Sequence, residues 1–216
     1  MRVRRSSEES RRVILEAAAA LLIEGGPHAV QVRAVAKRVG MTDAGVNHHF
    51  GSRDALLLAL LRHGAYRLRD SVQTAVTQWI DVEEDADVAG LVAAIAAVYA
   101  EGYGELAIAL HAAGWRDEGG GLLDSVVDAL HQARRRAGVP SPRKEDTRLA
   151  VAALHQALAT EAVYGAAFRR SAGISPRAAR SSTRQLAWWT ATLEQRLGLR
   201  VTRELPDTGS DSEDAL

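Results

Sequence analysis

The segment from Val32 to Arg53 contains two short helical patterns separated by one glycine. The first pattern, over residues 32–39, carries its apolar residues on one side and ends at Gly40, a residue suited to closing a helix. Thr42 is placed to cap the second pattern, from Asp43 to about residue 49, because its hydroxyl can accept from a first-turn amide. The segment therefore predicts two compact helices joined by a tight turn.

Longer helical patterns flank this segment on both sides. Ser6 and Glu9 have the spacing of a capping box, and the helix that they begin is expected to stop at Gly25-Gly26-Pro27. Ser52 is placed to cap a long helix that begins at Arg53, with an apolar stripe formed by Leu56, Leu57, Leu60 and Leu61. The first 70 residues thus predict three compact helices and a fourth that leaves the group.

The remainder of the chain is also helical in pattern, with no strand alternation and no internal repeat. Serine–proline pairs at 141–142 and 175–176 predict the starts of two long helices, because proline is favoured at the first helical position. We expect helices over residues 90–102, 104–115, 122–137, about 142–170 and about 176–198. The predicted fold class is all-α, with an N-terminal three-helix helix-turn-helix domain (1–52), a C-terminal helical domain (53–200) and an acidic, disordered tail (201–216).

Composition excludes several classes of function. The chain has no cysteine, so disulfides, thiolate metal sites and cysteine nucleophiles are excluded. Hydrophobic residues make up 47% and charged residues 25%, as in ordinary globular proteins. We find no apolar run of about 18 residues that would span a membrane, and the charged N-terminus does not resemble a signal peptide. The expected location is cytoplasmic, without membrane association.

Charge is distributed unevenly although the net charge is zero. Residues 1–69 hold twelve Lys/Arg against six Asp/Glu, and residues 70–216 hold fifteen against twenty-one. A basic first third joined to an acidic remainder suggests that the first third meets a polyanion. A chance division of charge is the alternative.

Two short helices around a glycine-containing turn have the geometry of a helix-turn-helix, whose second helix lies in the major groove of DNA. Val35, Ala36 and Val39 are spaced to pack against Val46 and Phe50. The small and polar side chains left facing outward suit close approach to base edges: Asp43, Ala44, Gly45, Asn47, His48 and His49. An amphipathic helix pair with no DNA-binding role would show a similar pattern.

The stretches RRVILEAAAALLIEGG and VRAVAKRVGMTDAGVNHHFGSRDALLLALL resemble the N-terminal signature of TetR-family regulators. The match includes Val-Arg-x-Val-Ala, the Gly-Met-Thr turn, the His-His-Phe end of the recognition helix and Ser-Arg-Asp-x-Leu at the start of the fourth helix. The resemblance implies a homodimeric transcription regulator that binds a pseudo-palindromic DNA operator. In this family such a protein is usually a repressor released by a small-molecule effector in its C-terminal domain.

The resemblance also implies roles for single residues. At the position of Arg33 the family has an arginine that contacts phosphate or a base, and at that of Thr42 a residue that caps the recognition helix and can bond phosphate. A basic residue at the position of Arg53 holds a phosphate beside a helix N-terminus. Base edges face the positions of Asp43, Ala44 and Gly45, while base and backbone contacts are shared by those of Asn47, His48 and His49.

Three positions depart from the family pattern. Asn47 stands where a phosphate-bonding tyrosine is usual, and asparagine can instead pair with adenine. Gln31 replaces the usual threonine cap of the second helix and predicts a weaker start for that helix. Arg53 replaces a common lysine, which keeps the charge and adds a second donor group.

If the resemblance holds, an effector cavity lies between the helices of the second domain. Its candidate lining residues, for which ordinary core packing is the alternative, are Trp79, Tyr99, Tyr103, His111, Trp115 and His155. The last two helices are the candidate dimer interface, with small residues for close helix approach and tryptophans as anchors. Its candidate residues, which would otherwise cover the domain's own core, are Leu154, Leu158, Gly165, Trp188, Trp189 and Leu193.

Other functions have weaker support in the sequence. His48 and His49 are adjacent, so they point about 100° apart on a helix and make a poor metal chelate. We expect no metal, no cofactor and no enzymatic activity, because no nucleophile has an evident base and no phosphate-binding glycine loop occurs. An architectural DNA-binding protein without an effector is the main alternative, although its cationic patches would be denser. A helical enzyme is a more distant one.

Overall fold

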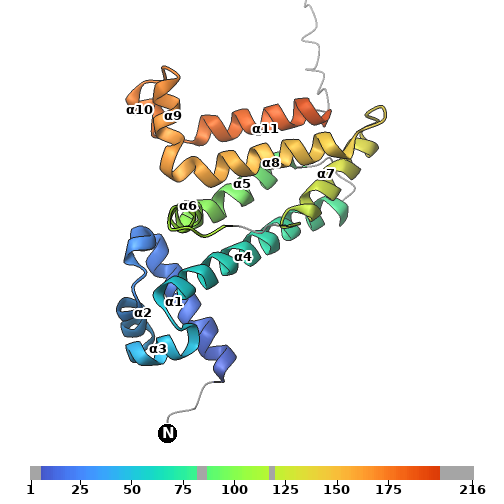
Figure 1. Ribbon diagram of the computed structural model, residues 1–216. Coiled ribbons are helices and arrows are strands. Elements are labelled where there is room, and N and C mark those ends of the chain that lie inside the picture. The colour runs from blue at the N-terminus through green and yellow to red at the C-terminus, as the bar shows by residue number, and fades with distance from the viewer. Residues whose placement is uncertain (1–5, 82–86, 117–119, 200–216) are drawn as a thin grey trace, which may run out of the picture.

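The computed structural model describes residues 6–81, 87–116 and 120–199, except for the side chains of residues 75, 76 and 78–81. Within these ranges every regular element is helical. The predicted tail (201–216) lies outside the described residues. The elements shown in Figure 1 are α1 (Ser7–Ala29), α2 (Val32–Val39), α3 (Asp43–Phe50), α4 (Arg53–Asp81), α5 (Val88–Val98), the π-helical turn η1 (Tyr99–Tyr103), α6 (Gly104–Ala112), α7 (Asp124–Arg136), α8 (Lys144–Thr160), the π-helical turn η2 (Glu161–Gly165), α9 (Ala166–Ser171), α10 (Pro176–Ala179) and α11 (Thr183–Leu197).

The helix starts of the first domain are confirmed by their capping bonds. The hydroxyls of Ser6, Thr42 and Ser52 accept from main-chain amides three residues later at 3.0, 3.1 and 3.1 Å. Gly40 ends α2 in the left-handed conformation, with φ of 70°. In α1 the helical conformation breaks at Gly25 and Gly26, as predicted, but one further turn carries the element to residue 29.

Two boundaries of the second domain differ from prediction. The helix expected over about 142–170 is present as the continuous run α8, η2 and α9, with a π-helical turn inside it, but the one expected over about 176–198 is divided into α10 and α11. The Ser141-Pro142 start was wrong: Ser141 has φ of 44° and α8 begins only at Lys144. The Ser175 cap is confirmed, because its hydroxyl accepts from the amide of Ala178 at 3.4 Å.

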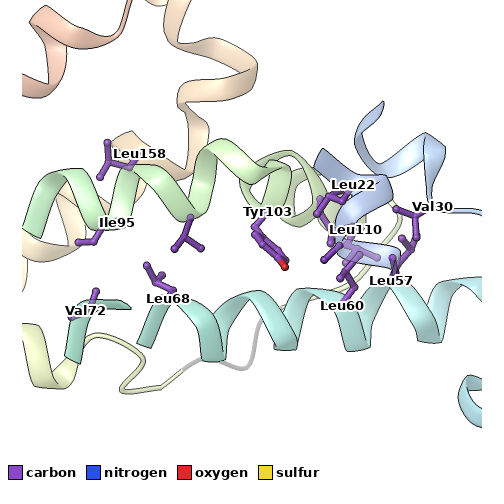
Figure 2. Close-up of a cluster of buried hydrophobic side chains, with 14 of the residues drawn as sticks. Leu22, Val30, Leu57, Leu60, Leu68, Val72, Ile95, Tyr103, Leu110 and Leu158 are labelled. Carbon is purple, nitrogen blue, oxygen red and sulfur yellow. The ribbon is translucent and has the colours of Figure 1, made fainter. Parts of the chain in front are cut away.

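Helix α4 belongs to both parts of the molecule. Figure 1 shows it leaving α1–α3 and running beneath the helices of the second domain. Its buried residues Leu57 and Leu60 lie by Leu22 and Val30, while Leu68 and Val72 face the second domain (Figure 2). The core is therefore continuous between the two parts.

A buried glycine, Gly64, allows α4 to approach η1 closely. Tyr103 reaches from η1 toward α4 (Figure 2), and a methyl group at position 64 would overlap its ring. On the other side of the same rod, a methyl group at Gly104 would overlap the carbonyl of Ala159 in α8. The rod formed by α5, η1 and α6 is thus held between α4 and α8.

This rod, Val88–Ala112, is the one stretch among the described residues that is long and apolar enough to cross a membrane by length and composition. We expected no such stretch from the sequence. Leu91, Ile95 and Leu106 on it are fully buried in the chain's own core, and Gly102 interrupts it with φ of 93°. As a whole, 39% of the apolar window is buried inside the structure.

The buried guanidinium of Arg134 joins three helices of the second domain. Its Nε donates to the carbonyl of Leu197 at 3.1 Å, at the end of α11. Its Nη1 donates to the carbonyl of Arg143 at 2.9 Å and to the hydroxyl of Thr147 at 2.8 Å, at the start of α8. Arg134 thus satisfies two carbonyls that would otherwise lie unpaired in a dry region.

We expect Arg134→Ala to lower the free energy of unfolding by about 3 kcal/mol, because buried carbonyls lose a charged donor. Urea denaturation of the purified protein measures the change. Arg136→Ala, in the same turn but exposed, is the matched control and should stay within about 0.5 kcal/mol of the parent. Equal losses in both variants would contradict the structural role of Arg134.

Candidate nucleic-acid interface and cavity

Helices α2 and α3 pack as a single unit on α1. Val35 and Ala36 of α2 and Val46 and Phe50 of α3 are buried, as the sequence pattern predicted, and Val39 is half-buried. The turn between the helices is closed by a hydrogen bond of 2.9 Å from the amide of Met41 to the carbonyl of Ala36. This fixes the angle between α2 and α3, which is the geometry of a helix-turn-helix.

The outward face of α3 carries the residues that the sequence singled out. Thr42, Asp43, Ala44, Asn47 and His48 are exposed, and Gly45 and His49 are half-exposed. Arg33 on α2 is exposed as well, and so is Lys37 one turn further along. Lys37 was not among the predicted site residues, although its spacing of four from Arg33 places both cations on one helix face.

Arg11 of α1 is a second residue that the sequence patterns did not reveal. Its guanidinium lies 4.4 Å from the centre of the Phe50 ring and donates to the carbonyl of His49. The contact attaches the C-terminal end of α3 to α1 and brings a cation to the edge of the outward face. Nothing in the helical periodicity distinguishes Arg11 from an ordinary solvent-exposed arginine.

The cation of Arg38 is already neutralised by Glu24. The guanidinium donates to both carboxylate oxygens, at 2.8 and 2.5 Å, and this hydrogen bonding lowers the pKa of Glu24. Both side chains are exposed, so the pair itself adds little stability. It does leave Arg33 and Lys37 as the cations of α2 that no carboxylate of the described chain pairs with.

Arg53 binds the protein's own backbone. Its Nε donates to the carbonyl of Val30 and its Nη2 to that of Pro27, each at 2.9 Å, and the side chain is half-buried. These bonds attach the start of α4 to the loop between α1 and α2. The sequence suggested a phosphate contact at this position, and the structure gives the guanidinium a second task that leaves fewer donors for it.

Gln31 does not cap α2, in agreement with the weaker helix start expected from its sequence position. Its side-chain amide donates instead to the carbonyl of His28 at 2.9 Å. The first turn of α2 is therefore positioned by the loop that Arg53 holds.

A cavity of about 430 Å³ lies in the second domain between α4, the α5–η1–α6 rod and α8. Four of the six predicted effector residues line it: Tyr99, Tyr103, Trp115 and His155. His111 does not, because it is exposed near the end of α6. The side chain of Trp79 lies outside the described residues. One wall is formed by α4, from Leu61 to Arg69.

Two tyrosines bring buried hydroxyls to the cavity lining. The hydroxyl of Tyr99 pairs with the ring of His155 at 3.1 Å, and burial raises the pKa of Tyr99 well above its usual value. Burial also raises the pKa of Tyr103, while the nearby Arg67 guanidinium acts in the opposite direction. Arg67 is held in turn by Glu101, which joins α4 to η1. Both phenols are therefore neutral at physiological pH.

The candidate dimer residues are divided between the core and the surface. Leu154, Leu158 and Leu193 are at most 3% exposed and Gly165 is buried, so these four cover the chain's own core, which was the alternative reading. Trp189 is half-buried against that core. Trp188 is 56% exposed, and the exposed apolar side chains near it in sequence or on neighbouring helices are Leu149, Val163, Tyr164, Phe168 and Ile174.

No group of three or more His, Asp or Glu side chains within the described ranges is arranged to hold a metal ion. His48 and His49 contact each other edge to face, with ring centres 5.4 Å apart. The site is thus an exposed, mainly polar surface on α2 and α3, with Arg33 and Lys37 as the cations that pair with no described carboxylate, together with a separate cavity that α4 connects to it.

Residues 14–60 match the family model described as bacterial regulatory proteins of the tetR family. The N-terminal part of the chain thus carries a TetR-type DNA-binding domain. The matched residues run from within α1 to the first two turns of α4, and so contain the helix-turn-helix and Arg53.

Similar solved structures include BioQ with its double-stranded DNA operator (19% identity, 88% of this chain and 98% of that chain, TM-score 0.49). Others are PfmR from Thermus thermophilus (20%, 86% and 97%, TM-score 0.46) and the superantigen PfiT (18%, 93% and 100%, TM-score 0.49). At TM-scores below 0.5 these likenesses say nothing about what this chain binds. None of the curated proteins matches the chain.

Two arginines of the TetR-type domain are expected to behave differently. Arg33→Ala should weaken binding to all duplexes about equally and reduce the slope of log affinity against log salt by about one, with no change in melting temperature. Arg53→Ala should also lower the melting temperature, because the carbonyls of Pro27 and Val30 lose their donor. Fluorescence anisotropy over a salt series and thermal melting measure both effects. If Arg53→Ala left stability unchanged, its structural role would be refuted.

Proposed function

We propose that this chain is a homodimeric, sequence-specific transcription regulator whose hold on a pseudo-palindromic operator is released by a small molecule in the cavity. It acts in the cytoplasm as a repressor. The observation that carries the proposal is that one helix, α4, positions the DNA-binding unit at its start and lines the cavity further along.

The coupling begins with Arg53. Through its two hydrogen bonds, a change in the tilt of α4 pulls on the loop between α1 and α2. Two to four turns later, Leu61, Ala65 and Leu68 of the same helix form the cavity wall. A molecule that fits the cavity only when this wall has moved would therefore also move α2 and α3.

Such a molecule releases DNA only by binding the two arrangements unequally. If it binds the tilted state about a hundredfold more tightly, it shifts the equilibrium by about 2.7 kcal/mol. That shift lowers operator affinity at saturation by at most about a hundredfold, and no change follows from equal binding however tight.

A second copy of the chain is the proposed cover for the exposed apolar side chains of α8, η2, α9 and α11. Phe168 is 61% and Leu149 62% exposed, and Tyr164 stacks on Phe168 with ring centres 5.6 Å apart. Large exposed apolar side chains gathered on a few helices are typical of protein interfaces. A symmetric pair would also present two α3 helices to two half-sites.

Selection of random duplex DNA on the purified protein, near physiological salt, tests the function directly. Recovery of a motif with two inverted half-sites supports the proposal. Uniform, strongly salt-dependent recovery would favour the alternative of an architectural DNA-binding protein. Transcription from a template carrying the recovered motif then gives the sign of regulation.

Asn47 is expected to read a base within that motif. Asn47→Ala should relax the preference at one or two positions of each half-site, at a cost of about 1–3 kcal/mol on the preferred sequence and little on others. Repeating the selection with the variant measures this. Equal losses on every sequence would mean that Asn47 contacts only the DNA backbone.

The dimer is tested by placing charge on its proposed surface. Phe168→Glu combined with Trp188→Glu should raise the dimer dissociation constant by at least about a hundredfold, because two carboxylates would be buried without partners. Analytical ultracentrifugation measures the change. Ile23→Glu, at an exposed residue of α1, is the matched control. Dimers of equal strength in both variants would place the interface elsewhere.

A further inference from the structure

Tyr103 lines the cavity, and the proton of its buried hydroxyl has no acceptor among the described residues. The residue is 3% exposed. Arg67 is near, but an arginine only donates, so it offers nothing to accept the phenolic proton. A buried donor without an acceptor is costly, and the described residues supply none to this one.

The charged groups that line the same cavity are cations. Arg62 and Arg69 of α4 both line it while remaining exposed to solvent, seven residues apart and therefore on one face of the helix. Tyr66 lies between the two arginines in sequence, and the guanidinium carbon of Arg69 is 5.9 Å from the centre of its ring. No described carboxylate lines the cavity or pairs with either arginine. The adjoining surface is apolar, from Val98, Ala107 and Leu122.

From these two observations we propose that the cavity takes an apolar molecule carrying one carboxylate, which accepts from Tyr103 and is balanced by Arg62 and Arg69. The regulatory role of such a molecule rests on the proposed function, whereas its binding to the cavity does not depend on that function. The carboxylate supplies the acceptor that the phenol lacks, and a charge-assisted bond of this kind is stronger than a neutral one. The apolar part covers Val98, Ala107 and Leu122.

The cavity also selects against other head groups. An alkyl ammonium would lie beside two guanidiniums and could not accept from Tyr103. An alcohol could accept from Tyr103 but would leave the arginine charges unbalanced. The quantity to measure is therefore the binding affinity of ligands that share one alkyl chain length and differ in their head group. A volume of about 430 Å³ holds a carboxylate with a short alkyl or phenylalkyl group.

Isothermal titration calorimetry on the full chain tests this with octanoate, octan-1-ol and octylamine, and with 4-phenylbutyrate as a second carboxylate. We expect at least one carboxylate to bind about tenfold or more tightly than the alcohol and the amine. Arg62→Leu combined with Arg69→Leu should weaken that carboxylate about tenfold and leave octan-1-ol within about twofold. Arg177→Leu, at an exposed residue of α10, is the matched control.

Tyr103→Phe is the sharper variant, because it keeps the ring against Gly64 and removes only the hydroxyl. It should bind the carboxylate about tenfold more weakly while melting at the same or a higher temperature than the parent, since an unpaired buried donor is gone. The proposal is overturned if neither carboxylate binds, if all three octyl compounds bind alike, or if the variants bind the carboxylate as the parent does. Duplex selection is independent of these results, so failure here leaves the proposed DNA reading standing.

Discussion

The unbroken helix α4 is the constraint on which the rest of this structure depends. Over 29 residues it has no proline and no cap inside it, so its main-chain hydrogen bonds run without interruption from the DNA-binding unit into the second domain. Each neighbouring element is then placed by what it meets on α4: the loop between α1 and α2 by Arg53, and η1 by Gly64. The two domains share one core because they share this helix.

The features that the sequence predicted well are those decided within a few residues. Capping by Thr42 and Ser52, and the end of α2 at Gly40, each depend on one local hydrogen bond or one backbone conformation. Tertiary contacts decided the features that it missed. Arg143 rather than Ser141 precedes α8, and its carbonyl accepts from Arg134 on α7, a contact that no local pattern encodes.

The same distinction applies to the site. The outward face of α3 followed from periodicity, because a helix packed by Val46 and Phe50 must expose the opposite side. Arg53 has the same charge whether it holds phosphate or the protein's own carbonyls, so only the structure distinguishes these two roles. Arg62 and Arg69 were missed in the cavity because charged residues on an amphipathic helix ordinarily belong to its solvent face. The dimer candidates Leu154 and Leu193 were ambiguous because an apolar residue on a helix can face either the chain's own core or a partner subunit.

The close contact between Gly64 and the ring of Tyr103 determines how α4 can move. The ring occupies the place of a missing side chain, and the positions four residues before and after on the same face of the helix are filled by the buried Leu60 and Leu68. A slide of α4 along its axis in either direction would therefore bring a leucine side chain toward the ring. Gly64 and Tyr103 also line the cavity, so a molecule bound there would touch the point at which α4 meets η1. The start of the same helix is attached through Arg53 to the loop before α2.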